Sequence, residues 1–272
     1  MANEEASGMG EWASLLPARG RLAFSLEEAK TAFAGRSPAA VRLALNRLSK
    51  KGKVLPVHRG YYLVIPAQHS MRGILPPALF VDGLMRHLGR PYYACLLSAA
   101  AFHGAAHQQA QEFFVATGFP ALRPLVKKGV KVNFISKAIP PESLLESRNT
   151  EAGFLKISSP ALTAADLVQF EKRIGGLNRA AAVLVELAEV MLAEQFSPAF
   201  TGHVPVAVLQ RLGWLLEKAA GQPGLAQGLY ENCRHAGLRF HPVPLKASGK
   251  KGGFPVDERW KVAVNAQIDV EA

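Results

Sequence analysis

The sequence predicts an α+β protein in which a small N-terminal unit of helices and one β-hairpin precedes a larger mixed α/β domain. Two helix-capping signals lie close together in residues 25–52, and a short apolar hairpin follows them directly. Residues 66–77 contain three prolines and no periodicity, which indicates a connection between domains. Beyond it, apolar strand segments alternate with helical patterns. We therefore expect domains at residues 1–66 and 67–272, the second open to subdivision near residue 200.

Composition limits the class of protein. The chain has 272 residues, 49% of them hydrophobic, which is enough for two packed domains. A net charge of +11 favours a polyanionic partner, either nucleic acid or an anionic membrane surface, although a basic enzyme fits the charge alone. Cys95 and Cys233 form no disulfide framework, which fits a reducing cytoplasm. The acidic N-terminus lacks a signal-peptide pattern, and the apolar stretch Ala180–Leu192 is too short and charged to span a membrane.

The N-terminal elements begin with a short helix expected at Gly10–Leu16 and a brief strand at Arg21–Phe24. The next helix starts at Ser25, because Ser25 and Glu28 have the spacing of a capping box, in which each side chain satisfies a free backbone N–H. Gly35 is expected to end this helix in a left-handed conformation.

A second helix follows almost at once. Ser37 is a good N-cap, Pro38 suits the first helical position, and Gly52 suits the end. The apolar stripe of this helix consists of Val41, Ala44, Leu45 and Leu48. The opposite face carries Ala39, Arg42, Asn46 and Lys50, with Arg47 near its edge. From Lys30 to Arg59 the chain contains eight Lys or Arg residues and no Asp or Glu.

A β-hairpin with a basic tip completes the unit. Its strands are expected at Val54–Val57 and Tyr61–Val64, joined by a turn at His58–Gly60. Pro56 cannot donate to a ladder, which places it on a sheet edge. Helix, tight turn, helix and basic hairpin is the pattern of a winged helix-turn-helix, whose second helix enters the major groove of DNA.

Candidate DNA contacts follow from this pattern. Arg42 and Asn46 are expected to read bases, because Arg can bond guanine and Asn adenine through two hydrogen bonds each. The lysines at the helix end and at the base of the hairpin are expected to bind phosphates. The full set of candidate residues is Ser37, Arg42, Asn46, Arg47, Lys50, Lys51, Lys53, His58, Arg59 and Tyr61. The alternative is an ordinary helical core with a solvated basic face.

The larger domain alternates between helices and strands. Helices are expected at Ala78–Leu88, Tyr92–His103, Pro160–Phe170, Leu177–Phe196, Val204–Ala220 and Pro223–His235. Ser159 is expected to cap the helix that begins at Pro160. Strands are expected at Phe113–Thr117, Val130–Ser136, Phe154–Ser158 and Trp260–Asn265.

No enzyme chemistry is predicted. His103 and His107, with Cys95 nearby, have zinc-ligand spacing, but Gly104 interrupts the helix and no HExxH pattern is present. The acids lack the paired spacing of a two-metal site, and Asp166 is expected to be a polar or capping residue. Gly249–Gly253 lacks the order of a phosphate-binding loop. We therefore expect no metal, no cofactor and no catalysis.

Several sequence segments, taken together and in this order, resemble those of the AbiEi family. The members of this family are antitoxins of type IV toxin–antitoxin systems first associated with abortive phage infection. The segments are RGYY at 59–62, PYYA at 91–94, SAAAFHG at 98–104, FFVAT at 113–117, ISSPALTAADL at 157–167, QRLGWLL at 210–216 and WKVAVN at 260–265. The acidic N-terminal extension before Trp12 and the Gly249–Gly253 loop are departures from the family pattern, so their roles stay open.

The resemblance implies a bifunctional protein. In this family the winged helix binds inverted repeats of double-stranded DNA in its own promoter, often cooperatively with a second copy, and represses the operon. The C-terminal portion opposes a neighbouring nucleotidyltransferase toxin, without a stable complex being required. The contacts implied here are Arg42, Asn46, Arg47, Lys50, Lys53, His58 and Arg59. Two alternatives remain: a winged-helix regulator with a small-molecule sensor domain, and an enzyme acting on nucleic acid.

Overall fold

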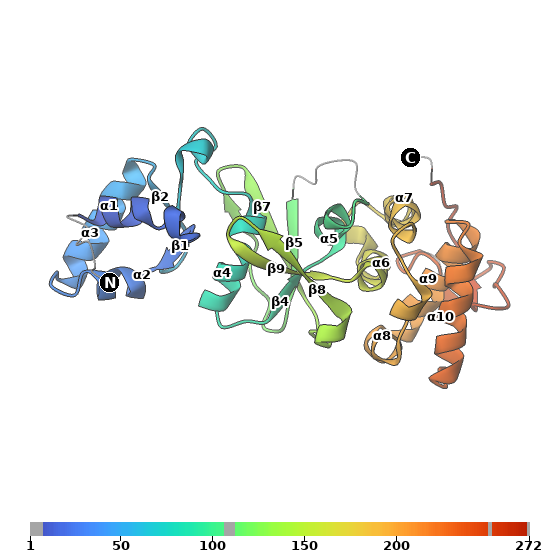
Figure 1. The fold of residues 1–272 in the computed structure, drawn as a ribbon. Coiled ribbons are helices and arrows are strands. Elements are labelled where there is room, and N and C mark those ends of the chain that lie inside the picture. Colours follow the sequence, from blue (N-terminus) through green and yellow to red (C-terminus); the bar gives the residue numbers. More distant parts are fainter. Residues whose placement is uncertain (1–7, 106–111, 250–251, 271–272) are drawn as a thin grey trace. The chain divides into compact units, whose positions relative to one another are not determined.

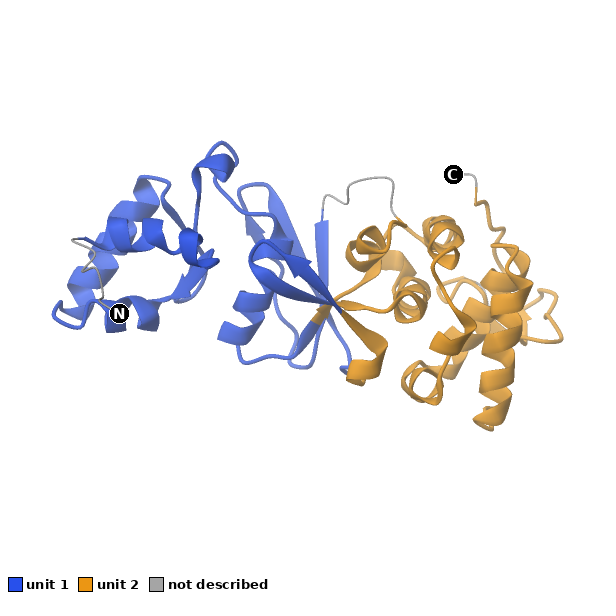
Figure 2. Ribbon diagram, in the orientation of Figure 1, with its two compact units in different colours: residues 1–92, 111–139, 147–156 blue, residues 93–110, 140–146, 157–272 orange. Residues whose placement is uncertain are grey.

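The protein has a mixed α+β fold. The structure, a computed structural model, describes residues 8–105, 112–249 and 252–270. In this part it contains ten α-helices and three β-sheets (Figure 1). The chain divides into two compact units (Figure 2), of which the first contains residues 1–92, 111–139 and 147–156 and the second residues 93–110, 140–146 and 157–272. The predicted α+β class is confirmed.

Three helices and a small sheet open the first unit. The helices are α1 (Met9–Leu15), α2 (Leu26–Ala32) and α3 (Pro38–Lys50). The strands are β1 (Ala23–Ser25), β2 (Val54–His58) and β3 (Tyr61–Val64), in the antiparallel order β1-β3-β2. Their shared core is made of apolar side chains from every one of these elements. Its buried members are Met9, Ala13, Leu16, Phe24, Ala29, Val41, Leu45, Val54 and Val64.

The predicted caps are present. The Glu28 N–H donates to Ser25 Oγ at 3.1 Å, and the Ser25 N–H donates to the Glu28 carboxylate at 2.6 Å, so the capping box is confirmed. Ser37 Oγ accepts from the N–H of Ala40 at 3.2 Å and caps α3. The end predicted for α2 is wrong, because Phe33 is its C-cap residue and Gly35 is outside the left-handed region.

A six-stranded mixed sheet follows in the order β6-β7-β5-β4-β9-β8. Its strands are β4 (Tyr92–Ala94), β5 (Glu112–Thr117), β6 (Leu125–Lys127), β7 (Val130–Ser136), β8 (Leu145–Thr150) and β9 (Gly153–Ser158). The pairs β5–β7 and β4–β9 are parallel, whereas β6–β7 is antiparallel. Helix α4 (Val81–His87) belongs to the first unit, and its buried side chains are Val81, Leu84 and Met85.

The second unit is mainly helical. Its helices are α5 (Leu96–Phe102), α6 (Pro160–Gln169), α7 (Leu177–Ala188), α8 (Pro198–His203), α9 (Val206–Lys218) and α10 (Pro223–His235). A two-stranded parallel sheet joins β10 (Val243–Pro244) to β11 (Val262–Ala263). The last predicted strand is therefore much shorter than expected. Ser159 caps α6 by accepting from the N–H of Leu162, as predicted.

Two predicted helices are wrong in extent. The helix expected at Tyr92–His103 is a strand, β4, followed by the shorter helix α5, because Cys95 is extended and Leu96 has a φ of 52°. The parallel pairing of Ala94 with Ile157 provides backbone partners that no local pattern reveals. The helix expected at Leu177–Phe196 ends at Ala188, and Leu192 already has an extended backbone.

A buried tryptophan organises the end of the second unit. Trp260 is fully buried, and its Nε1–H donates to the Glu217 carboxylate at 2.9 Å. The rings of Tyr230 and Phe240 lie 5.4 Å and 5.9 Å from the Trp260 ring, centroid to centroid. Helix α9 meets the indole through Gly213, where an added Cβ would lie 2.1 Å from two ring carbons. Only a residue without a side chain allows this close contact.

Replacing Gly213 with alanine is therefore expected to destabilise the protein by about 3 kcal/mol, because the methyl group would force the Trp260 ring out of its site. Urea unfolding followed by tryptophan fluorescence measures the effect. Gly224→Ala in α10 is the matched control, since its added Cβ meets nothing within 4 Å and should change stability by less than about 1 kcal/mol. Equal effects of the two changes would contradict the packing described.

Candidate nucleic-acid interface

Helix α3 presents one polar face to solvent. Val41 and Leu45 are completely buried in the N-terminal core, which fixes the rotation of the helix about its axis. The side chains at positions i, i+3 and i+4 on the other face then point outward. Arg42, Asn46, Arg47 and Lys50 are all exposed. The structure therefore brings the predicted base-reading residues together on one face of one helix.

The end of α3 and the hairpin tip add further positive charge. Lys51 and Lys53 are exposed just after α3, and His58 and Arg59 are exposed at the tip, where Gly60 turns the chain with a φ of 72°. Within the part of the chain that the structure describes, none of these basic side chains forms an ion pair with a carboxylate. Their charge is available to an anionic partner.

Not every cation of the basic stretch is available in this way. Lys30 Nζ lies 2.8 Å from the Glu27 carboxylate, within α2. The guanidinium of Arg36 lies over the Phe33 ring, 5.2 Å from its centroid. The counterions and ring partners of the stretch are thus at its α2 end, and the uncompensated charge is on α3 and the hairpin.

Tyr61 is placed differently from the other candidates. It is only 5% exposed, and its hydroxyl lies where a Cβ of Gly83 would approach to 2.2 Å. Burial is the main cause that raises the pKa of its hydroxyl far above the ordinary value of 10.0, so the group stays protonated. Tyr61 therefore packs against α4, and its side chain is not on the exposed basic face.

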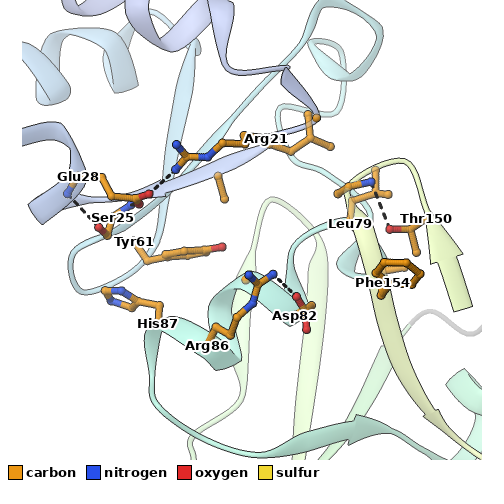
Figure 3. Close-up of a pocket in the computed structure, with 16 residues that line it drawn as sticks. Arg21, Ser25, Glu28, Tyr61, Leu79, Asp82, Arg86, His87, Thr150 and Phe154 are labelled. Carbon is orange, nitrogen blue, oxygen red and sulfur yellow. Dashed lines mark hydrogen bonds and ion pairs between the residues drawn. The ribbon is translucent and has the colours of Figure 1, made fainter. Parts of the chain in front are cut away.

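Tyr61 forms one wall of a polar cavity of about 390 Å³ (Figure 3). Two ion pairs line this cavity, Arg21 with Glu28 and Arg86 with Asp82. Desolvation acts to raise the pKa of Glu28, but the Ser25 N–H and the Arg21 charge outweigh it and leave the pKa below its ordinary value. Because each guanidinium already faces a carboxylate, the cavity has no net charge to attract an ion.

The hairpin tip is held by a histidine from α4. His87 Nε2 lies 3.2 Å from the backbone carbonyl oxygen of Arg59, within hydrogen-bonding distance. The His87 ring also lies 5.1 Å from the Tyr61 ring and 6.4 Å from the His58 ring. These contacts fix the position of the tip relative to α4 in the first unit.

One residue of the exposed face was missed from the sequence. Leu43 is 52% exposed and lies on α3 beside Arg42 and one turn before Asn46 and Arg47. Its position outside the apolar stripe was the available signal, because a leucine there cannot reach the core. Leu43 adds one exposed apolar side chain to the polar face of α3.

The other singled-out residues have structural partners. The Tyr93 hydroxyl donates to the carboxylate of buried Asp166 at 3.0 Å. His103 Nε2 lies 2.8 Å from the Ser158 carbonyl oxygen. No group of three or more His, Cys, Asp or Glu side chains that could hold a metal occurs among the described residues. His107, Lys250, Lys251 and the acidic residues before Ser7 lie outside the described residues.

Comparison with known proteins identifies the central part of the chain. The family model described as AbiEi antitoxin C-terminal domain matches residues 92–218. This segment belongs to the AbiEi antitoxin family. The resemblance found in the sequence is thereby confirmed for it. AbiEi antitoxins are a regulatory, non-enzymatic kind of protein, and an antitoxin implies a toxin as its partner.

A solved structure supports the fold of the whole chain. The crystal structure of the RV2827C protein from Mycobacterium tuberculosis is similar with a TM-score of 0.66, over 96% of this chain and 92% of that chain. The two sequences are 18% identical, so this likeness concerns the fold alone. A search of curated proteins gives no match. Among the described helices, none has the length and apolar character needed to cross a bilayer.

Proposed function

We propose that this protein is an antitoxin that also represses transcription of its own operon. The match of residues 92–218 to the AbiEi antitoxin C-terminal domain carries the proposal. The uncompensated cationic face of α3 and the hairpin supports its DNA-binding half. We assign DNA binding to residues 1–66, as a winged helix-turn-helix, and toxin antagonism to residues 67–272. The toxin is a nucleotidyltransferase encoded in the same operon, and both act in the cytoplasm.

The proposed DNA complex follows from the orientation of α3. With Val41 and Leu45 in the core, the opposite face enters the major groove, where Arg42 and Asn46 reach base edges. Lys50, Lys51 and Lys53 lie at the end of the helix, where they meet phosphates and release counterions. The hairpin tip, with His58 and Arg59, contacts the adjacent backbone. Two copies bind the inverted repeats of the promoter, since two-fold symmetric sites require a second copy.

Antitoxin activity is expected to appear as rescue of growth. Cells expressing the nucleotidyltransferase from the neighbouring reading frame should stop growing, and co-expression of this chain from an unrelated promoter should restore growth. The double variant Arg42→Ala, Lys50→Ala should rescue equally well, because rescue from an unrelated promoter does not require repression. Failure of the native chain to restore growth would refute the antitoxin half.

DNA-binding measurements on two variants are expected to distinguish base-reading residues from phosphate-binding residues. On a duplex carrying inverted repeats from the chain's own upstream region, Arg42→Ala should lose about 1–3 kcal/mol of discrimination between operator and scrambled DNA. Lys50→Ala should weaken binding to both duplexes alike and lower the slope of log K against log salt by about 1. Fluorescence anisotropy over a range of salt concentrations measures both.

Lys30→Ala is the control for these two variants, because Lys30 already pairs with Glu27 and belongs to α2, not to α3. Its affinity and salt slope should equal those of the native chain. Native protein that binds operator and scrambled duplexes equally would refute the repressor half, whatever the variants do.

Leu43 is expected to contact the C5-methyl group of a thymine, since it is the exposed apolar side chain between Arg42 and Asn46. Replacing each operator thymine by uracil removes one methyl group at a time. At one position of each repeat, this should weaken native binding about fivefold. Leu43→Ala should bind less tightly and become insensitive to uracil at that position. Equal uracil sensitivity in both proteins would exclude the contact.

A further inference from the structure

A second cavity lies beside the hairpin strand β2. It measures about 490 Å³ and is formed by β2, α4, the segment 121–124, β6 and β7 of the first unit. Its deepest lining consists of buried apolar side chains: Val57 at 5% exposure, Leu84 at 0% and Leu125 at 8%. Leu88, Leu122 and Phe134 are half-buried and extend this apolar lining toward solvent.

The charged residues of this cavity both have the same sign. Arg123 and Lys127 are exposed and line it beside the exposed His58, and no Asp or Glu is among its lining residues. Neither Arg123 nor Lys127 pairs with a carboxylate in the described part of the chain. The cavity therefore has an apolar interior and an uncompensated cationic rim, unlike the polar cavity with its two internal ion pairs.

The loop that forms one wall of the cavity is held in place. The Arg90 guanidinium donates to the backbone carbonyl oxygens of Gly118 and Pro120, just before the segment 121–124. Leu122 and Arg123 are thus carried by a loop with two anchored carbonyl groups. A preformed wall lowers the ordering cost that a ligand would otherwise meet on binding.

We infer that this cavity binds a small amphipathic anion, with an apolar aliphatic or aromatic body and one carboxylate. The volume falls in the range of small-molecule sites, which combine an apolar lining with a few polar groups that orient the ligand. The body would contact Leu84, Leu122 and Leu125. The carboxylate would remain at the rim, paired with Arg123 and Lys127, where it keeps part of its hydration.

The position of the cavity links it to the hairpin. Val57 and His58 belong to β2, and His58 is adjacent to the tip that carries Arg59. An anion beside His58 would neutralise part of the positive charge near the tip. If the hairpin contacts DNA as proposed above, occupancy weakens that contact, and by linkage DNA weakens ligand binding by the same factor. Binding of the anion itself does not rest on the proposed function.

The test uses the full chain without DNA and the fluorescent probe 8-anilinonaphthalene-1-sulfonate, an aromatic anion. We expect saturable binding of one probe per chain, displaced by octanoate. Ala121→Trp, which fills the cavity from its rim, should abolish binding. Arg123→Gln with Lys127→Gln should weaken it about tenfold. Lys128→Gln is the matched control, since Lys128 is exposed next to Lys127 but does not line the cavity.

Four results would overturn the inference: binding without saturation, binding that survives Ala121→Trp, equal effects of Lys128→Gln and of the double change at Arg123 and Lys127, or no displacement by octanoate. Melting curves of each variant verify that it is folded. A neutral probe, N-phenyl-1-naphthylamine, separates the charge from the apolar contact. It should bind the native chain and the Arg123→Gln, Lys127→Gln variant equally, and a tenfold loss with this probe would show that the double change damages the cavity itself.

Discussion

Burial of Val41 and Leu45 fixes the functional geometry of the N-terminal region. Both side chains are completely buried against α1, α2 and the small sheet, so α3 cannot rotate without exposing them. Ser37 fixes where the helix begins, and Gly52 lets the chain turn out of it with a φ of 69°. The orientation of the polar face follows from these constraints. The charged side chains on that face are exposed and form no ion pair among the described residues, so they are free to serve a partner.

The hairpin depends on contacts from beyond the N-terminal segment. Tyr61 packs on Gly83, and His87 approaches the Arg59 carbonyl, so α4 supports the tip of the hairpin and the strand residue that follows it. This support explains how a two-residue tip can keep a defined position. It also places two cavities of different chemistry on the strands of the hairpin. One is internally neutralised, and the other combines an apolar interior with cations.

The sequence segments that resemble the antitoxin family consist largely of buried residues. In the segment 157–167, nearly every side chain is buried, including the polar ones. Ser158 Oγ and Thr163 Oγ1 lie 2.6 Å apart, and Asp166 accepts from Tyr93. Gly213 belongs to another of these segments, 210–216, and leaves room for Trp260. These residues specify how the second unit packs. Any surface that meets a toxin must be formed by other, exposed side chains around this interior.

The sequence alone predicted those features that depend on residues close to one another in the chain. The caps at Ser25, Ser37 and Ser159, the apolar stripe of α3 and the turn at Gly60 depend on neighbours within a few residues, and the structure has them all. The candidate face of α3 could be predicted for the same reason. The strand β4 could not, because its partner Ile157 is more than sixty residues away from Ala94.

The same distinction applies to the candidate site. Arg42, Asn46 and Lys50 share a face because helical periodicity alone puts them there. Tyr61 was listed among the candidate DNA contacts because no local sequence pattern indicates its packing against Gly83, which belongs to another element. The cationic apolar cavity likewise joins β2, α4 and β6, three elements with no common local pattern. Periodicity and capping act over one or two turns of chain, whereas burial and cavities arise when distant segments exclude water together.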